Sequence, residues 1–199
     1  MAVLMILEAP GATTAEYDRT NEIMGIHGDD DAPEGLVEHV VASDGNGLVI
    51  ADVWESEEAL GRFYEERLGA ALEESGVSRS ASPPRRLQVH NALRGRGARA
   101  GALLVVEIDG FTPDLYDKMT EGMDVHAGDG ADHPSVWHAV GVKDNGELLV
   151  ADVWESPEAF GQFAQEVIGP RGAEVGLPQF EPRLIPVHNS IRGRAALPA

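Results

Sequence analysis

Runs of aliphatic residues of strand length alternate along the chain with segments whose apolar residues recur every three or four positions. The run at 3–8 predicts a strand, and a helix is predicted to begin at Thr13 or Thr14. Two further strands flank the sequence DGNG, which is typical of a hairpin turn. A second helix from Ser56 and a strand over 86–91 follow. The predicted order is strand, helix, strand, strand, helix, strand.

The same order recurs in the second half of the chain. The hexapeptide ADVWES occurs at 51–56 and again at 151–156, and PRRLQVHNALRGRG in the first half matches PRLIPVHNSIRGRA in the second. The match covers nearly all of both halves. We therefore predict two repeats, 1–94 and 102–199, joined by an exposed linker rich in Gly, Arg and Ala over 95–101.

This element order is that of a ferredoxin-like unit, in which two helices cover one face of a four-stranded antiparallel sheet. In the third strand both sides are apolar, with Leu48 and Ile50 on one side and Val49 and Val53 on the other. Both faces of the sheet should therefore be covered. We predict an α+β fold of two tandem ferredoxin-like βαββαβ units that pack sheet to sheet, as an intramolecular pseudo-dimer forming an α/β barrel.

Composition narrows the classes of partner and of chemistry. The chain has 15 Lys and Arg against 34 Asp and Glu, a net charge of −19, which disfavours nucleic acid and anionic membranes as partners. There is no cysteine, so thiol nucleophiles, disulfides and thiolate metal sites are excluded. The N-terminal segment lacks the basic residues that open a signal peptide. We expect a soluble, cytoplasmic, acidic protein.

Both repeats carry a W-E-S-x-E-A segment, at 54–59 and 154–159, that leads from the third strand into the second helix. In this respect the chain resembles the antibiotic biosynthesis monooxygenases of the dimeric α/β-barrel superfamily, as if their dimer were fused into one chain. The resemblance implies a small-molecule substrate. Activities in the superfamily include cofactor-independent quinone-forming oxygenation, haem degradation, isomerisation and ligand binding. A haem-degrading variant would need an axial histidine, which neither predicted second helix contains.

The turn chemistry predicts which residues oppose each other in the first hairpin. With Gly45 and the following Asn as a two-residue loop, His39 faces Asp52 and Val37 faces Trp54. Because side chains alternate along a strand, the tryptophan lies on the same face as the aspartate. An imidazole and a carboxylate that face each other in this way are close enough to hydrogen-bond.

The second hairpin predicts the same opposition through a different loop. A three-residue loop over 144–146, with its glycine in the left-handed conformation, places His138 opposite Asp152. Trp154 then lies on the same face as Asp152. Two loop lengths therefore give the same His–Asp opposition in both repeats.

We interpret each pair as a histidine base whose tautomer is held by a carboxylate, beside a tryptophan wall on which a flat substrate could stack. The alternative is a buried, mutually satisfied pair beside a core tryptophan. The candidate catalytic residues are His39, Asp52, His138 and Asp152. The candidate substrate-binding residues begin with Trp54 and Trp154.

Four weaker candidates lie around the first helix of each repeat. Tyr17 and Tyr116 fall on its inner face and could donate a hydrogen bond to a substrate carbonyl, or simply pack there. His27 and His126 lie in the loop that follows, either at the mouth of a pocket or merely exposed at the surface. We include all four as candidate substrate-binding residues.

A metal site of three histidines, His27, His39 and His90, deserves a test because imidazole is a common zinc ligand. In the usual ferredoxin-like order, however, the second and fourth strands lie at opposite edges, about 14 Å apart. No metal is therefore predicted within one repeat, although a site across the two repeats stays open.

These observations favour a small-molecule enzyme, a cofactor-independent monooxygenase that acts on an aromatic or polyketide-like substrate by His-assisted proton abstraction. Oxygen as co-substrate is implied by the resemblance alone, and the residues would suit an isomerase or cyclase equally. The alternative is a non-catalytic ligand-binding or structural protein. No cofactor is predicted, and further homo-oligomers stay open. The two pockets are free to differ, since His133, Trp137 and Lys143 have no counterparts in the first repeat.

Overall fold

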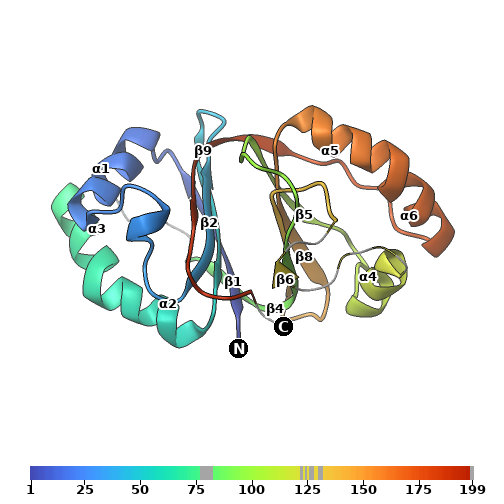
Figure 1. Ribbon diagram of the computed structural model, residues 1–199, viewed down its shortest axis with the longest axis horizontal. Coiled ribbons are helices and arrows are strands. Elements are labelled where there is room, and N and C mark those ends of the chain that lie inside the picture. Colours follow the sequence, from blue (N-terminus) through green and yellow to red (C-terminus); the bar gives the residue numbers. More distant parts are fainter. Residues whose placement is uncertain (77–82, 122, 124, 126–127, 130–131, 198–199) are drawn as a thin grey trace. The chain divides into compact units, whose positions relative to one another are not determined.

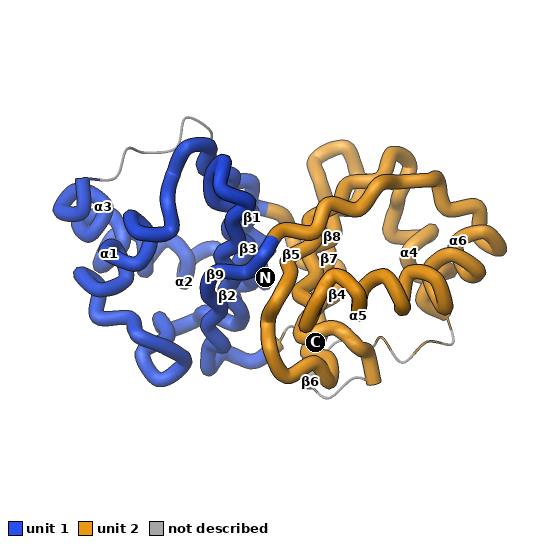
Figure 2. The backbone as a smooth tube through the Cα atoms, turned by 90° about the horizontal axis from the view of Figure 1, so that it is seen from above, with its two compact units in different colours: residues 1–86, 186–196 blue, residues 87–185, 197–199 orange. Residues whose placement is uncertain are grey.

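The last strand of each predicted repeat pairs with the second strand of the other repeat (Figure 2). In the computed structural model the chain accordingly forms two compact units, unit 1 from residues 1–86 and 186–196 and unit 2 from residues 87–185 and 197–199. The predicted repeats are stretches of sequence, and their bounds and tandem ferredoxin-like arrangement stay predictions. The structure describes residues 1–76, 83–121, 123, 125, 128–129 and 132–197.

Unit 1 has an antiparallel sheet of strand order β1-β3-β2-β9, with its helices on one face (Figure 1). Its strands are β1 (Val3–Pro10), β2 (Leu36–Ala42), β3 (Gly47–Trp54) and β9 (Leu184–Arg192). Its helices are α1 (Thr14–Met24), α2 (Glu57–Phe63) and α3 (Gly69–Ser75), with a short 3₁₀ turn at Asp29–Asp31.

Unit 2 has the strand order β5-β8-β7-β4-β6, in which only the short β6 runs parallel to its neighbour. Its strands are β4 (Arg85–Arg94), β5 (Ala102–Glu107), β6 (Gly128–Asp129), β7 (Trp137–Val142) and β8 (Leu148–Trp154). Its helices are α4 (Pro113–Thr120), α5 (Pro157–Phe163) and α6 (Gly169–Val175).

The helices begin where the capping residues predict. Thr13 caps α1 in a reciprocal capping box, and Thr112 caps α4 with a proline in its first turn. Ser56 and Ser156 accept hydrogen bonds from the third residue of α2 and α5, at 3.1 and 3.2 Å. The second helix of each repeat is not one continuous α-helix, however. A π-helical turn interrupts it, at Tyr64–Leu68 and at Ala164–Ile168.

The predicted opposition of histidine and aspartate is confirmed in both hairpins, His39 with Asp52 and His138 with Asp152. The prediction that Val37 faces Trp54 is wrong. A register shift between residues 36 and 38 inserts an extra residue, so that residue 36 pairs with Trp54 instead. The glycine of the second loop has a φ of +81°, as the three-residue turn requires.

The segment 95–101, predicted as an exposed linker, is bonded along its length to unit 2. Its backbone N–H groups at Gly95, Arg96 and Gly97 donate to carbonyls of residues 133–136, at 2.9–3.1 Å. An added Cβ at Gly95 would lie 2.3 Å from one of these carbonyl oxygens, so only glycine allows the approach. The glycines of this predicted linker permit close backbone contact.

Both faces of the central strands are buried, as their apolar pattern predicts. Every residue of β8 is buried, and so are six of the eight residues of β3. That the two sheets cover each other stays a prediction. Among the described residues no helix is both long enough and apolar enough to span a membrane.

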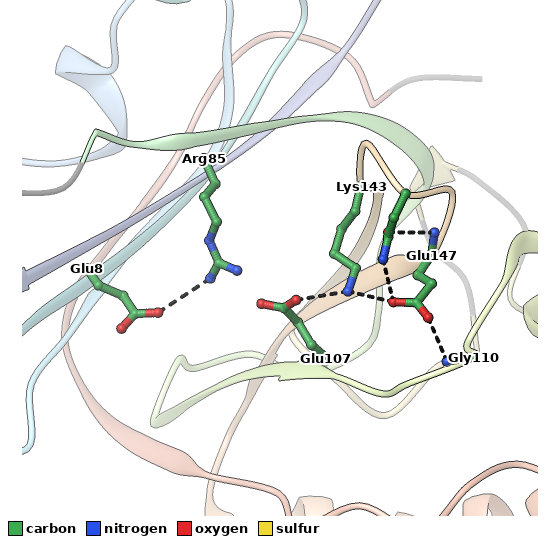
Figure 3. A network of polar contacts seen from close by, with 7 residues as sticks. Glu8, Arg85, Glu107, Gly110, Lys143 and Glu147 are labelled. Carbon is green, nitrogen blue, oxygen red and sulfur yellow. Dashed lines mark hydrogen bonds and ion pairs between the residues drawn. The ribbon is translucent and has the colours of Figure 1, made fainter.

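The hairpin turn of unit 2 is fixed by a network of polar contacts around Glu147 (Figure 3). The Glu147 carboxylate accepts hydrogen bonds from the Gly110 N–H at 2.8 Å, from Lys143 Nζ at 3.0 Å and from Asn145 Nδ2 at 2.8 Å. These donors, led by the Gly110 N–H, lower the pKa of Glu147 to about 2. The same figure shows the ion pair of Glu8 with Arg85 in unit 1, at 3.4 Å.

Replacement of Glu147 by Gln should therefore lower the melting temperature at neutral pH. A carboxyl whose pKa is lowered on folding contributes stability above its unfolded pKa, near 4.5, and loses it as the pH falls through about 2. The deficit of E147Q should thus shrink from pH 5 toward pH 2. E8Q is the matched control, because an exposed pair contributes little. A deficit that is constant over this pH range would contradict the account.

Candidate functional site

In unit 1 a row of four hydrogen-bonded side chains crosses from the sheet to the first helix. His39 on β2 bonds through Nδ1 to Asp52 Oδ1 on β3, at 2.7 Å. Its other nitrogen, Nε2, lies 2.8 Å from the hydroxyl of Tyr17 on α1. Asn189 on β9 donates from Nδ2 to the same hydroxyl at 2.9 Å. The predicted His–Asp pair is thus one part of an Asp–His–Tyr–Asn row.

Unit 2 contains the same row. His138 Nδ1 lies 2.5 Å from Asp152 Oδ1, and His138 Nε2 lies 2.9 Å from the hydroxyl of Tyr116 on α4. Asn91 on β4 donates to that hydroxyl at 2.7 Å. In each row the asparagine comes from the last strand of the other predicted repeat. The pairing of these strands with β2 and β7 therefore completes both rows.

One backbone carbonyl sets the direction of the hydrogen bonds in unit 2. Asn91 Nδ2 also donates to the carbonyl oxygen of Val125 at 3.0 Å, and this orients the NH₂ group. Tyr116 therefore accepts from Asn91 and is free to donate its own proton to His138 Nε2. His138 then carries its proton on Nδ1 and donates it to Asp152. With this direction of hydrogen bonds, Nε2 of His138 is the acceptor, as in the tautomer that acts as a base.

Burial determines the state of the two tyrosines. Desolvation raises the pKa of Tyr17 to about 12, and it raises the pKa of Tyr116 further. Both are neutral phenols at physiological pH, and each ring stacks on the imidazole of its row, with centroids 5.8 Å apart. In each row the tyrosine hydroxyl therefore lies between the imidazole and the asparagine.

A cavity of about 80 Å³ lies in unit 2, and three members of the row, Tyr116, His138 and Asp152, line it. Its other walls are almost wholly apolar. They are formed by Leu104, Val106, Ile108, Phe111, Met119, Thr120, Met123, Val125, Val150, Phe160, Phe163, Ile168, Leu177 and Phe180, together with His133. A hydrogen-bonded acid–base row that borders an apolar cavity is a typical arrangement of a small-molecule site.

Both predicted tryptophans are core residues. Trp54 is 1% exposed and donates from its indole N–H to Asp52 Oδ2 at 3.3 Å. Trp154 is fully buried, and its indole N–H has no acceptor among the described residues. Trp154 packs against Phe163, which lines the cavity, and is not itself among the described lining residues.

Of the two loop histidines, the structure describes only His27. His27 is exposed after α1, and its backbone N–H donates to Asp31. His126 falls outside the described residues. His90 bonds Asp117 at 3.0 Å within unit 2. In the part of the chain that the structure describes, no group of three His, Asp or Glu side chains is arranged to hold a metal ion.

Sequence reasoning missed three residues of these sites. Asn91 and Asn189 complete the rows, and His133 lines the cavity of unit 2. The recurrence of a His-Asn pair at the end of both last strands was a signal for the asparagines. For His133 the only signal was that it has no counterpart in the first repeat.

The unit 1 row lies beside a packed apolar cluster. Buried Leu36, Trp54, Leu60 and Ile191 belong to it, and partly buried Phe63 packs against it. In unit 2 Tyr116 itself belongs to a packed apolar cluster, but the row also borders the cavity, which has a titratable side chain, His133, in its wall. The two rows therefore have the same chemistry in different surroundings.

No family model and no curated protein matches the sequence. A putative monooxygenase from Fusobacterium nucleatum is similar in structure at 7% identity, with a TM-score of 0.68 over 96% of this chain and 94% of the other. A putative monooxygenase from Lactobacillus acidophilus is 12% identical, with a TM-score of 0.66 over 99% of both chains. An anthrone oxidase-like protein is 18% identical, with a TM-score of 0.51 over 96% and 92%.

These similarities establish the fold and nothing finer. They cover nearly the whole chain, both units included, so the mixed α/β architecture with antiparallel sheets is one that these solved structures share. At such low identity a shared fold does not carry a shared reaction.

Proposed function

We propose that the protein is a small-molecule enzyme whose active site is the cavity of unit 2, where the row of Asp152, His138 and Tyr116 removes a proton from the substrate. The observation that carries the proposal is that this row, with its proton direction fixed, borders an apolar cavity. A neutral imidazole held by a carboxylate is the usual form of a general base.

The row modifies the predicted mechanism in one respect. Because the Tyr116 hydroxyl occupies His138 Nε2, the imidazole takes the substrate proton through that hydroxyl. As the substrate transfers a proton to the Tyr116 oxygen, the hydroxyl proton moves to His138, and Asp152 stabilises the resulting imidazolium. The raised pKa of Tyr116 favours this coupled transfer over a free tyrosinate. Asn91 keeps the phenol oriented throughout.

The further step in the proposal is a reaction with oxygen that needs no cofactor. A CH₂ group made acidic by a neighbouring carbonyl would lose two hydrogens and gain one oxygen atom of O₂ as a new carbonyl, and the second oxygen atom would leave as water. The similarity in fold to two putative monooxygenases and an anthrone oxidase-like protein supports this choice. Part of the proposal is that the two repeats act as an intramolecular pseudo-dimer.

The size of the cavity limits the substrate. Ligand pockets usually measure about 300–1,000 Å³, well above the 80 Å³ found here. An aromatic substrate therefore fits only if side chains that line the cavity move aside. Met119 and Met123 are the wall residues best suited to do so, because the methionine side chain is unbranched and adaptable. One- and two-ring substrates should be accepted more readily than three-ring ones.

An oxygen electrode distinguishes the proposed reaction from its alternatives. Purified protein would be given 2-indanone or anthrone, ketones with an acidic CH₂, and oxygen uptake and the product would be measured. Oxygen consumption matched by a new carbonyl and water supports the monooxygenase. Proton exchange without oxygen uptake favours an isomerase or cyclase. Binding without either reaction would favour a non-catalytic ligand-binding protein.

A further inference from the structure

We propose that His133 donates a hydrogen bond to the carbonyl oxygen of the substrate, and that the substrates are accordingly ketones with an acidic C–H next to the carbonyl. The proposal rests on the proposed proton transfer in unit 2 and adds the group that holds the developing negative charge. His133 is 6% exposed and lines the same cavity as Tyr116 and His138.

The hydrogen bonds of His133 define its tautomer. Its Nδ1 accepts a hydrogen bond from the backbone N–H of Ser135 at 3.3 Å, so this nitrogen carries no proton. The Ser135 hydroxyl lies 2.7 Å from the same nitrogen. The proton of the neutral ring is therefore on Nε2. Among the described residues no hydrogen bond reaches Nε2. A ring that is more than nine-tenths buried thus keeps one N–H donor available at a cavity.

The ring is held in place from two sides. Its face and edges contact the rings of Phe163, Trp154 and His138, with centroids 4.9, 5.7 and 5.7 Å away. The backbone carbonyl of His133 accepts a hydrogen bond from the N–H of Arg96 at 2.9 Å. The glycines on either side of Arg96 allow the segment to approach this closely. Residues 95–97, part of the predicted linker, therefore position His133.

The surroundings keep the His133 imidazole neutral, as its proposed role as a hydrogen-bond donor to the substrate carbonyl requires. Burial lowers the pKa of His133 to about 4. His138 and Arg96 lower it further by smaller amounts, and the charge of Asp152 opposes the shift. A neutral imidazole that donates to a carbonyl does not compete for the proton that His138 must receive. The position at the same distance before His39 in the first repeat is Glu34, which is exposed.

The proton-transfer step then balances. The C–H bond next to the carbonyl breaks, its proton goes to the Tyr116 oxygen, and the Tyr116 proton goes to His138 Nε2. The electron pair forms a C=C bond while the carbonyl becomes an enolate oxygen, to which His133 Nε2–H donates. An oxyanion donor of this kind typically contributes about 10²–10³-fold in rate.

The test replaces His133 by Leu, which removes the donor, and by Gln, which keeps an N–H donor on a polar side chain. Deuteration of 2-indanone next to its carbonyl in D₂O is followed by NMR. We expect H133L to slow the protein-dependent exchange about 100-fold and H133Q to recover most of it. Unchanged exchange in H133L would overturn the proposal, while H138Q separately tests the base.

A binding measurement keeps the proposal testable if the wild type exchanges no protons. Acetophenone and α-methylstyrene have nearly the same shape, and only the first has a carbonyl acceptor. In ligand-observed NMR titrations the preference of the wild type for acetophenone should fall about 5-fold in H133L, as expected for one lost hydrogen bond, and be retained in H133Q. An equal preference in wild type and H133L would contradict the role of His133 whatever the activity. If H138Q loses exchange but keeps the wild-type preference for acetophenone, the role of His138 as the base is separated from the role of His133 as the carbonyl donor.

Discussion

Replacing His138 by Gln will reduce the protein-dependent deuteration of 2-indanone by about 10³-fold, within the range expected for loss of a general base. Gln fills a similar volume but cannot accept a proton at neutral pH. Y116F should have a similar effect, because it removes the hydroxyl through which the proton reaches His138. The measurement is the initial rate of deuterium incorporation by NMR at saturating ketone.

The matched control is H39Q in unit 1, which alters the same row beside a packed apolar cluster. Its exchange rate should stay within about twofold of the wild-type rate, since a general base contributes only where it reaches substrate. A loss of activity in H39Q equal to that in H138Q would contradict the assignment of the active site to unit 2. It would indicate that both rows affect activity by stabilising the fold.

The stability of these variants separates a catalytic pair from a purely structural one. Asp152 has no hydrogen-bond partner other than His138 among the described residues, so H138Q should cost about 1–3 kcal/mol in the free energy of unfolding. Asp52 keeps its bond from Trp54, and H39Q should cost less. Adding D152N to H138Q should restore stability without restoring exchange. Recovery of activity in the double variant would indicate that the row has a structural role and not a catalytic one.

Replacing Gly95 by Ala will destabilise the protein by about 3 kcal/mol, or about 10 °C in melting temperature. The added Cβ would lie 2.3 Å from the carbonyl oxygen of Ser135 and 2.4 Å from that of His133. These are backbone atoms, and they cannot move aside without breaking the hydrogen bonds that join the two segments. Urea or thermal unfolding followed by circular dichroism measures the effect.

G161A provides the control for this prediction. Gly161 lies within α5, and an added Cβ would meet no atom within 4 Å. Alanine should therefore stabilise the protein by about 1 kcal/mol through its helix propensity. If G95A were as stable as the wild type, residues 95–97 would not lie against residues 133–135 as described, and the positioning of His133 would lose its support.

Local sequence signals were sufficient to predict the parts of the site that lie within one hairpin. The turn residues determine the pairing of His39 with Asp52 and of His138 with Asp152, because loop length sets the register over a few residues. The same reasoning failed at Trp54, where an extra residue shifts the register. A bulge depends on packing at the end of the strand, and Gly35, which lies directly before the strand with a φ of +82°, does not by itself say where an extra residue falls.

The parts of the site that depend on distant segments could not be predicted in this way. Asn91 meets Tyr116 because β4 pairs with β7, which is a choice of partner between strands far apart in sequence. Tyr116 was correctly placed on the inner face of its helix, but its bond to His138 depends on how that helix packs on the sheet. The close contact at Gly95 could not be predicted either, because glycine suits both exposed linkers and close backbone contact.

Deuteration of 2-indanone by the wild-type protein in D₂O tests the central claim most directly, that the row in unit 2 moves a proton to and from a bound ketone. The account predicts incorporation next to the carbonyl at a rate that is proportional to protein and saturates with ketone, and that falls when α-methylstyrene competes for the cavity. Incorporation at the rate of buffer alone, with the ketone shown by NMR to occupy the cavity, would contradict it.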